Sequence, residues 1–406
     1  MGKIIINAEK IKEVLKKGVE KIYPNPEALE KLLKSGKRIR LYCGYDPTNT
    51  SLHIGHAITL RKLAQFQKLG HEVIFLIGDF TGMIGDPSDK TAARKKLNRK
   101  EILENLKNYK KQVSKILDFS GKNPAKVLYN SKWNNKLKFG DLIELASNFT
   151  VQQMIIRDMF QERIKNNKPI YLHEFLYPLA QAYDCVAMDV DLEIGGNDQT
   201  FNMLCGRDLI KALKNKEKLV LTLKLLTDPT GKKMGKTEGN MINLDEKPDQ
   251  MYGKIMSWPD ELIIPGLELC TNLSLDELAE ISEKIKAGKV NPRDEKAKLA
   301  KEVVSIHYDK KTAEEAEKEF NRVFKEGIQP TDIPEVKLNK RISSTSIVLV
   351  ETGLAPSRSA ADRLIKQGAI DVEIDGVVIN KYNKKEITPK KGMIIRAGKR
   401  KFVKLI

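Results

Sequence analysis

The sequence is poor in the residues that build metal and disulfide sites. Its 406 residues include four cysteines, five histidines and two tryptophans. The cysteines stand alone, at positions 43, 185, 205 and 270, and no two of them form a Cys-x-x-Cys motif. This spacing disfavours a zinc site and a disulfide framework, and it is typical of a reducing, cytoplasmic compartment. We therefore expect no protein-bound metal and a cytoplasmic location.

The sequence also lacks long apolar runs. No segment approaches the roughly 20 apolar residues of a membrane span. Residues 1–10 lack the pattern of a signal peptide. We expect neither membrane insertion nor export. A hydrophobic content of 41% with 31% charged residues is typical of a globular protein, and the length allows two or three domains.

Acidic residues are few relative to basic ones. The chain has 72 Lys and Arg against 54 Asp and Glu, a formal net charge of +18. Such an excess favours a polyanionic partner, most simply nucleic acid. The alternative is a lysine-rich genome that makes every protein basic. Residues 341–406 alone carry a net charge of +8, from 14 basic and 6 acidic residues, and this concentration counts against the alternative.

A strand, a loop and a helix follow one another between residues 38 and 70. Arg38–Cys43 has the pattern of a strand, and Ala57–Leu69 has apolar residues at helical spacing. Between them, His53 and His56 lie three residues apart, so they share one face of the first helical turn. Free N–H groups and the helix dipole make that turn suitable for a polyphosphate. Gly55 leaves room for a flat ring, and the alternative is two satisfied surface histidines.

The next segment completes a β-α-β unit. Val73–Ile77 is an apolar run typical of a buried parallel strand, and a glycine-rich loop follows at 78–87. The spacing of its glycines matches neither the dinucleotide nor the P-loop fingerprint. Residues 88–112 are strongly basic and include Lys90 and Arg94. They are either a solvated helix face or a loop that reaches phosphates.

Two later helices have distinct patterns. Residues 141–165 have the pattern of one long helix whose apolar stripe serves either the core or a subunit interface. On the helix predicted at 171–184, Tyr177, Gln181 and Asp184 share one face. Burying these polar groups without partners would cost roughly 1–3 kcal/mol each, so they indicate a small polar ligand. A strand at 188–194 then ends in a tight turn, where ligands of open α/β sheets bind.

Two motifs about 180 residues apart resemble a known pair. His53–His56 (His-Ile-Gly-His) is similar to the first signature of class I aminoacyl-tRNA synthetases. Lys233–Thr237 (Lys-Met-Gly-Lys-Thr) is similar to the second, Lys-Met-Ser-Lys-Ser. Two lysines three apart in a glycine-containing loop suit the leaving pyrophosphate. Gly235 and Thr237 depart from the serines of the usual motif.

The C-terminal segment adds a second resemblance. Helical patterns at 344–352 and 357–367 precede short strands at 372–374, 377–379, 393–396 and 401–405. This segment resembles the S4 RNA-binding module. The basic residues of this segment that we expect to bind RNA are Arg358, Arg363, Lys366, Lys399, Arg400 and Lys401. Together with the two signatures, the whole chain resembles the bacterial-type tyrosyl-tRNA synthetases.

This resemblance implies a set of site residues. Tyrosine would be bound by Tyr42, Asp86, Tyr177, Gln181, Asp184 and Gln199. ATP and the adenylate would be bound by Cys43, Gly44, Asp46, Gly55, Gly196, Asp198 and Lys236. The catalytic residues would be Thr48, His53, His56, Lys90, Arg94, Lys233, Lys236 and Thr237. Tyr42 and Asp184 would hold the substrate phenol, and Tyr177, Gln181 and Asp86 its amino group. Glu193 departs from the glutamine that relatives often have.

The resemblance also implies the architecture and the partners. A Rossmann-like parallel sheet would form a catalytic domain at 1–225, with a helical insertion at about 120–170. A helical domain at 226–325, a linker at 326–340 and an S4 domain at 341–406 would follow. The partners would be tRNA(Tyr), L-tyrosine, ATP with Mg²⁺ as substrate, and a second copy of the chain.

Three alternatives stay open at this point. A tryptophanyl-tRNA synthetase shares both signatures, but it lacks the S4 segment and has no use for Asp184 opposite an indole. A non-catalytic RNA-binding protein would not need the histidines and lysines together. An unrelated nucleotidyltransferase would lack the set of polar residues that faces tyrosine.

Overall fold

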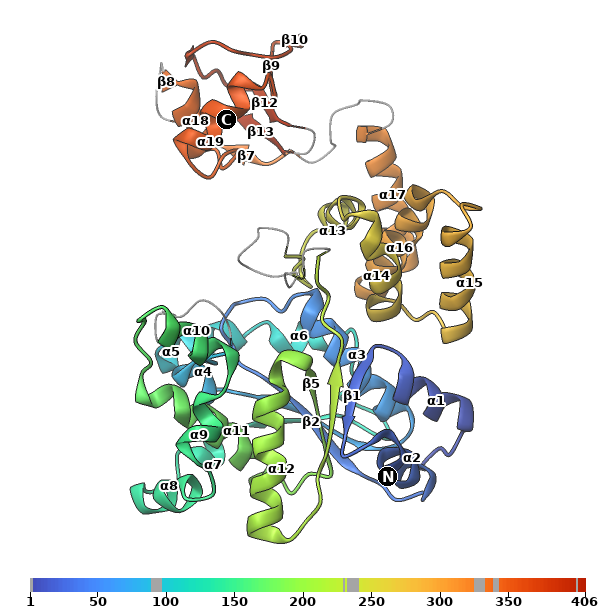
Figure 1. Ribbon diagram of the computed structural model, residues 1–406. Coiled ribbons are helices and arrows are strands. Elements are labelled where there is room, and N and C mark those ends of the chain that lie inside the picture. Colours follow the sequence, from blue (N-terminus) through green and yellow to red (C-terminus); the bar gives the residue numbers. More distant parts are fainter. Residues whose placement is uncertain are drawn as a thin grey trace. The chain divides into compact units, whose positions relative to one another are not determined.

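The computed structural model describes residues 3–88, 97–228, 231, 241–324, 333–338, 343–398 and 401–406. Within it the chain divides into two units, residues 1–314 and residues 315–406. The division falls inside helix α17 (Lys310–Phe324). Figure 1 draws the first unit in colours from blue to orange and the second in orange to red.

A six-stranded sheet organises the first unit. Its strands, in spatial order, are β1 (Val19–Tyr23), β6 (Leu219–Leu223), β5 (Leu192–Gly196), β2 (Arg40–Tyr45), β3 (Glu72–Ile77) and β4 (Lys126–Tyr129). All neighbours pair in parallel except β1 and β6. The chain runs outward from β2 to β4 and then returns to β5 on the other side of β2. Sheets of this kind bind ligands in a crevice outside the carboxyl ends of the strands at the switch point, which here lies at β2 and β5.

Helices connect and cover these strands (Figure 1). Those before the second half of the sheet are α1 (Ala8–Lys16), α2 (Pro26–Lys34), α3 (Ile54–Lys68), α4 (Thr81–Ile84), α5 (Arg99–Leu106), α6 (Tyr109–Val113) and α7 (Ser131–Asn134). Those that follow are α8 (Phe139–Ala146), α9 (Val151–Ile155), α10 (Asp158–Lys165), α11 (Leu172–Met188) and α12 (Thr200–Lys214). After the sheet come α13 (Pro248–Met256), α14 (Ile263–Cys270), α15 (Leu275–Lys286) and α16 (Pro292–His307).

Helices α3 and α11 lie on opposite faces of the sheet. Successive side chains of a strand point to opposite faces. Tyr42 of β2 packs against Cys185 of α11, whereas the Tyr45 hydroxyl lies 2.8 Å from the Thr59 hydroxyl of α3. Helix α12 packs on α11 and on β5 and β6. This arrangement confirms the predicted α/β class with a Rossmann-like sheet.

Two predicted elements were wrong. Residues 141–165 form parts of three helices, α8 to α10. Thr150 caps a new helix, α9, by accepting a hydrogen bond from the Gln153 N–H, and Arg157 has an extended backbone before α10. The predicted apolar stripe is consequently divided, with Phe160 buried and Ile156 exposed. The strand predicted at 188–194 begins only at 192, because α11 continues to residue 188 and Asp189 ends it with a left-handed backbone, φ 52°.

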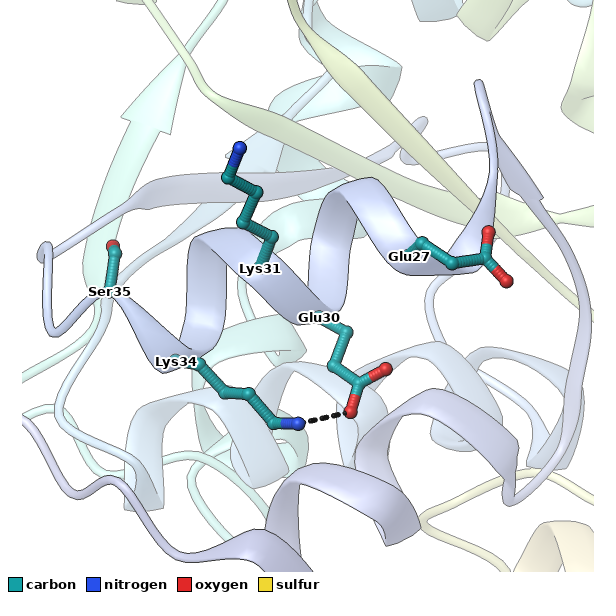
Figure 2. A pocket seen from close by; sticks show the side chains of 5 residues that line it. All are labelled: Glu27, Glu30, Lys31, Lys34 and Ser35. Carbon is teal, nitrogen blue, oxygen red and sulfur yellow. Dashed lines mark ion pairs between the residues drawn. The ribbon is translucent and has the colours of Figure 1, made fainter.

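Helix α2 carries a shallow surface hollow (Figure 2). Its lining consists of Glu27, Glu30, Lys31, Lys34 and Ser35. Every lining residue belongs to α2 or its C-terminal cap. The one ion pair drawn, Lys34 Nζ to Glu30 Oε1 at 2.6 Å, is an exposed i,i+4 pair of the kind that contributes little stability. We assign this hollow no function.

The second unit is a small α+β fold. A five-stranded sheet has the order β10 (Val377–Ile379), β9 (Ile370–Ile374), β12 (Ile394–Ala397), β13 (Lys401–Leu405) and β7 (Glu335–Val336). A two-stranded sheet joins β8 (Ser343–Ser344) to β11 (Glu386–Ile387). The helices are α18 (Thr345–Glu351) and α19 (Arg358–Lys366), as the sequence predicted. Strand β7 lies within the predicted linker and pairs with β13.

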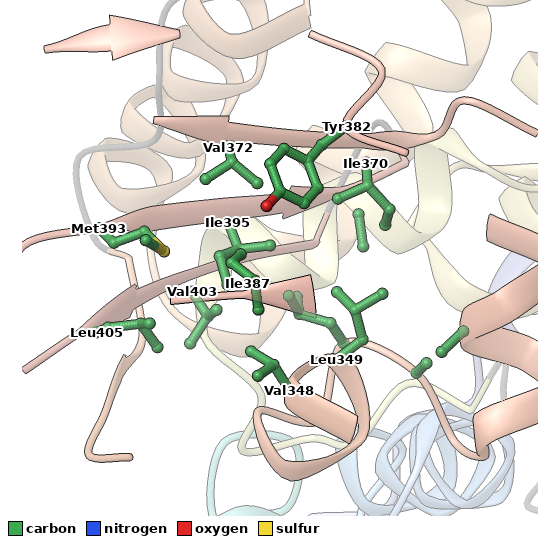
Figure 3. Packing of buried hydrophobic residues seen from close by; sticks show 14 residues of the cluster. Val348, Leu349, Ile370, Val372, Tyr382, Ile387, Met393, Ile395, Val403 and Leu405 are labelled. Atoms are coloured by element: carbon green, nitrogen blue, oxygen red, sulfur yellow. The ribbon is translucent and has the colours of Figure 1, made fainter. Parts of the chain in front are cut away.

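An apolar core holds the second unit together (Figure 3). Val348 and Leu349 of α18 pack against sheet residues that include Val372, Ile395 and Val403. Because these sheet positions alternate along their strands, one face of the sheet is buried under the helices. The polar side chains buried in the described part of this unit are Ser343, Thr345 and Ser346, so its described charges lie at the surface or partly buried.

Candidate active site

The first signature caps helix α3. His53 is the N-cap residue, and its Nδ1 accepts a hydrogen bond from the Gly55 N–H at 3.1 Å. The Nδ1 of His56 accepts one from the His53 N–H, also at 3.1 Å. The two rings stack with centroids 3.8 Å apart. These bonds hold both imidazoles at the positive end of the helix, where an anion is stabilised.

The chain that follows the second signature returns to the first. The Ile54 N–H donates to the Ile242 carbonyl at 2.9 Å, and the Leu244 N–H donates to the Leu52 carbonyl at 2.8 Å. The two signatures are thus linked by backbone through residues 242–244. The predicted phosphate-binding residues Lys90, Arg94, Lys233, Lys236 and Thr237 lie outside the described residues.

Asp184 is a buried carboxylate that accepts three side-chain hydrogen bonds. It is buried, and its oxygens accept from Trp133 Nε1 at 2.7 Å, Asn134 Nδ2 at 3.0 Å and Asn130 Nδ2 at 3.2 Å. Burial raises the pKa of Asp184, and the three donors oppose this shift because they stabilise the ionised carboxylate. The next residue, Cys185, lies 3.1 Å from the Tyr42 hydroxyl, so Asp184 and Tyr42 occupy the same part of the crevice.

A second carboxylate, Asp46, lies just beyond β2. Its Oδ1 accepts from the Thr81 hydroxyl at 2.6 Å and its Oδ2 from the Tyr177 hydroxyl at 3.0 Å. Tyr177 and Asp46 were assigned to different parts of the substrate, and the structure joins them directly. A methyl group at Gly78 would lie 1.9 Å from Asp46 Oδ1, so the glycine-rich loop makes room for this carboxylate.

A third carboxylate, Asp86, bridges the loop after β3 and the turn after β5. Its Oδ2 accepts from Gln199 Nε2 at 2.6 Å, and its Oδ1 accepts from the Ser88 N–H at 2.9 Å. Gln199 Nε2 also donates to the Ser88 hydroxyl at 3.0 Å. Four more predicted residues are partly or fully exposed at the same strand ends: Gly44, Thr48, Gly196 and Asp198.

Cys43 differs from these residues because its side chain faces away from Tyr42. It is buried, and burial raises the pKa of its thiol to about 12. The thiol is therefore neutral at physiological pH.

Among the described residues, no group of three His, Cys, Asp or Glu side chains is placed to hold a metal ion. No helix in the described ranges is long and apolar enough to cross a membrane.

The predicted RNA-binding residues lie in the second unit. Arg358, Arg363 and Lys366 are exposed on α19, and Lys401 is exposed at the start of β13. Lys399 and Arg400 lie outside the described residues.

Several site residues were missed from the sequence. Asn130, Trp133 and Asn134 bind Asp184 from about 50 residues away, and Thr81 and Lys218 join the other carboxylates. Trp133 is one of only two tryptophans, which was the one available signal. The others depend on the topology that brings β4 and α7 beside α11.

Comparison with known proteins then identifies the family. A family described as "tRNA synthetases class I (W and Y)" matches residues 34–325. The chain belongs to this family. Curated tyrosine–tRNA ligases of Carboxydothermus hydrogenoformans and Haemophilus influenzae are each 44% identical to it. They align over 97% and 96% of this chain and over 97% and 95% of their own lengths.

Solved structures of synthetases share the fold. The truncated mitochondrial tyrosyl-tRNA synthetase of Coccidioides posadasii is 25% identical, with a TM-score of 0.62, over 77% of this chain and 92% of its own. That of Aspergillus nidulans is 21% identical, with a TM-score of 0.67, over 78% of this chain and 95% of its own. These matches confirm the resemblance to class I synthetases that the two signatures indicated.

Proposed function

We propose that the chain is a tyrosine–tRNA ligase. It activates L-tyrosine with ATP to form tyrosyl-adenylate and then transfers the tyrosyl group to the 3′ end of tRNA(Tyr). The curated relatives of this name, aligned over nearly the whole chain, support the reaction. The buried carboxylate of Asp184 in the crevice is the observation that carries the choice of tyrosine.

Asp184 and Tyr42 read the substrate phenol. The substrate hydroxyl donates to the Asp184 carboxylate and faces the Tyr42 hydroxyl. Phenylalanine lacks this group, and its binding would leave buried polar groups unpaired at a cost of roughly 1–3 kcal/mol each. Tryptophan is the second candidate substrate of the family. We favour tyrosine because a hydroxyl, unlike an indole N–H, can both donate to Asp184 and accept from Tyr42.

Activation requires no covalent enzyme intermediate. The tyrosine carboxylate attacks the α-phosphorus of Mg²⁺-bound ATP, a new C–O–P bond forms, and the bond to the β-phosphate breaks to release pyrophosphate. His53 and His56, with Lys233 and Lys236 of the second signature, stabilise the negative charge that develops on the phosphates. The resemblance to the family assigns the same role to four further residues: Thr48, Lys90, Arg94 and Thr237. A ribose hydroxyl of the tRNA then attacks the tyrosyl carbonyl and releases AMP.

The remaining assignments concern the rest of the chain. The amino group of tyrosine binds to Tyr177, Gln181 and Asp86, while Gln199 supports Asp86. Backbone and carboxylate groups at the strand ends bind the adenylate. The second unit is an S4-type module that holds the tRNA backbone through its basic surface. Charged tRNA is used where the ribosome works, so we place the enzyme in the cytoplasm. The domain boundaries at 225, 325 and 340 belong to this proposal.

We also propose a homodimer, built on helices α8 to α11. The large apolar side chains exposed there are Phe139, Ile143, Val151, Ile156, Ile164, Tyr171 and Leu172. An apolar hollow of about 300 Å³ between α4, α8 and α11 adjoins Phe139. Patches of this kind on a soluble enzyme mark protein interfaces. Light scattering at micromolar concentration tests the dimer, and Ile156→Asp with Leu172→Asp should dissociate it.

Pyrophosphate exchange tests the reaction. The purified chain is supplied with ATP, Mg²⁺, labelled pyrophosphate and each of the twenty amino acids in turn. We expect exchange that depends on tyrosine and that is unaffected by a zinc chelator. Exchange driven best by tryptophan would select the other member of the family. No exchange with any amino acid, together with RNA binding, would indicate a non-catalytic protein.

A further inference from the structure

A buried ion pair lies directly behind the crevice. The Lys218 side chain is fully buried, and Glu193 is 2% exposed. The Lys218 ammonium donates to Glu193 Oε2, to Cys185 Sγ at 3.1 Å and to the Met203 carbonyl at 3.0 Å. These three partners use all three ammonium protons. The pair is therefore completely satisfied inside the protein, on the face of the sheet that Tyr42 shares.

Helix α12 leaves space for this pair. A Cβ at Gly206 would lie 2.5 Å from Cys185 Sγ, 2.8 Å from Lys218 Nζ and 3.3 Å from Glu193 Oε2. Any side chain at this position would displace the ion pair. The helix thus carries a glycine where the pair needs room, although glycine weakens a helix interior.

Glu193 controls the direction of the hydrogen bond from Gln181. Gln181 Nε2 donates to Glu193 Oε1 at 3.0 Å. A carboxylate only accepts hydrogen bonds, so it fixes the amide with its nitrogen toward Glu193 and its oxygen away from it. Gln181 shares the crevice-facing side of α11 with Tyr177 and Asp184, so its amide oxygen is directed to accept from a ligand.

The same carboxylate also lies close to Tyr42. Tyr42 is the register partner of Glu193 between β2 and β5. Burial raises the pKa of Cys185 to about 12, so its thiol keeps its proton and donates it to Glu193 Oε2 at 3.3 Å. The Tyr42 hydroxyl lies 3.1 Å from the same sulfur, so the ion pair also supports the residue that faces the substrate phenol.

We propose that Glu193, held by Lys218, is a positioning residue that sets the hydrogen-bond direction of Gln181. The amide oxygen of Gln181 is thereby kept available for the ammonium group of tyrosine. This inference rests on the proposed function, because it takes the ligand of the crevice to be tyrosine. A glutamine at position 193 could donate as well as accept, and it would allow the Gln181 amide to turn over.

A purely structural role makes a different prediction. Replacing both members of a buried ion pair by neutral groups of similar size is often neutral or stabilising, because no charge is left unpaired. The double variant Glu193→Gln/Lys218→Met should therefore fold. If the pair serves only the fold, this variant should bind every ligand as the natural chain does.

The test compares two ligands that differ by one group. Calorimetry measures the binding of L-tyrosine and of 3-(4-hydroxyphenyl)propanoate, which lacks the amino group, to the natural chain and to the double variant. Arg163→Met/Glu174→Gln is the matched control, because it removes another buried ion pair that reaches α11. Thermal unfolding and tyrosine-dependent exchange at saturating tyrosine are measured for all three proteins.

We expect the double variant to lose tyrosine affinity by about tenfold, the effect of one hydrogen bond to a charged group. Binding of the deamino analogue should change less than twofold, exchange at saturating tyrosine should be retained, and the control should bind both ligands normally. Equal losses for both ligands, no loss for either, or a double variant that does not fold would overturn the proposal. Failure of the proposed function would instead be seen in the natural chain, as absence of tyrosine binding and exchange.

Discussion

The two units place their charges in opposite ways. The described part of the first unit buries eleven charged side chains: Lys17, Lys62, Asp79, Arg157, Arg163, Glu174, Asp184, Glu193, Lys218, Glu295 and Lys296. The described part of the second unit buries only serine and threonine among its polar side chains, although it carries a large share of the net positive charge. One unit therefore uses charge in its interior and the other uses it at its surface.

This difference matches two kinds of recognition. A small zwitterion such as tyrosine is read by a few buried polar groups, each fully hydrogen-bonded, because an unpaired one is costly. A nucleic-acid backbone is read by exposed cations, whose effect is additive and depends on salt. Binding of a small ligand by buried groups should therefore be lost after a single substitution. Binding of a nucleic acid by exposed cations should weaken gradually as cations are removed.

The largest effect is expected at Asp184. Asp184→Ala removes the acceptor of the substrate hydroxyl and leaves the Trp133, Asn130 and Asn134 donors unpaired. Tyrosine affinity should fall by at least about 100-fold, equivalent to about 3 kcal/mol. Calorimetry measures the tyrosine affinity. Asp184→Asn tests the same position with a side chain of the same shape but without the negative charge.

The control for that experiment is Asp189→Asn, an exposed aspartate just after the same helix. Asparagine tolerates its left-handed backbone. Unchanged tyrosine affinity in a folded Asp184→Ala protein would show that the buried carboxylate does not contact the substrate.

A smaller effect, on rate alone, is expected at His56. Its proposed contact is to phosphate charge that develops during activation, so His56→Ala should lower the exchange rate by about 100-fold. Tyrosine affinity should stay within about twofold of the natural value. Stopped-flow activation and equilibrium binding separate these quantities.

His56 also accepts a hydrogen bond at the start of α3, so a capping effect must be separated from catalysis. His56→Asn retains a capping acceptor but not an imidazole. A normal activation rate in the asparagine variant would assign His56 to the helix cap rather than to the chemistry.

A graded effect is expected in the second unit. Arg358→Ala/Arg363→Ala/Lys366→Ala should weaken tRNA binding by about tenfold at 0.15 M salt. The plot of log affinity against log salt should also become less steep. Its negative slope should shrink in magnitude by roughly 0.7–0.9 for each lost phosphate contact. Tyrosine-dependent exchange should be unchanged, because α19 lies outside the first unit. Filter binding over a salt series measures both quantities.

Lys31→Ala/Lys34→Ala, in the hollow of α2, is the matched control (Figure 2). It removes two exposed lysines from the first unit, and it should leave the salt slope as it is. An equal decrease in this control would mean that tRNA affinity follows total charge, not the second unit.

The smallest effect concerns acid stability. All five histidines lie in the first unit. Burial, reinforced by the nearby Arg61 and Lys115 charges, lowers the pKa of His307 from 6.5 to about 4. Between these values the unfolded chain binds more protons than the folded one, so the stability is present above pH 6.5 and is lost as pH falls toward 4.

The variant His307→Leu should consequently lose less stability than the natural chain between pH 7 and pH 5, by about 1–2 kcal/mol. Denaturant unfolding at the two pH values measures this. An identical pH dependence in both proteins would mean that the pKa of His307 is the same in the folded and the unfolded chain.

Much of the site could be predicted because its parts are local in sequence. A strand, a loop and a helix N-terminus place His53 and His56 together within four residues, and one helical face brings Tyr177, Gln181 and Asp184 into line. Periodicity and capping chemistry act over a few residues, and they are visible without a fold. The long helix predicted at 141–165 failed for a related reason. The Thr150–Gln153 capping box was overlooked within an apolar pattern.

The sequence by itself determined the Rossmann-like sheet, the paired signatures, the shared face of α11 and the basic C-terminal segment. Only the tertiary structure decided which partners each buried carboxylate has. Asn130, Trp133 and Asn134 reach Asp184 because β4 carries α7 beside α11, and Lys218 reaches Glu193 because β6 pairs with β5. A buried charge must find its partners in space, and those partners come from whichever elements the sheet topology brings together.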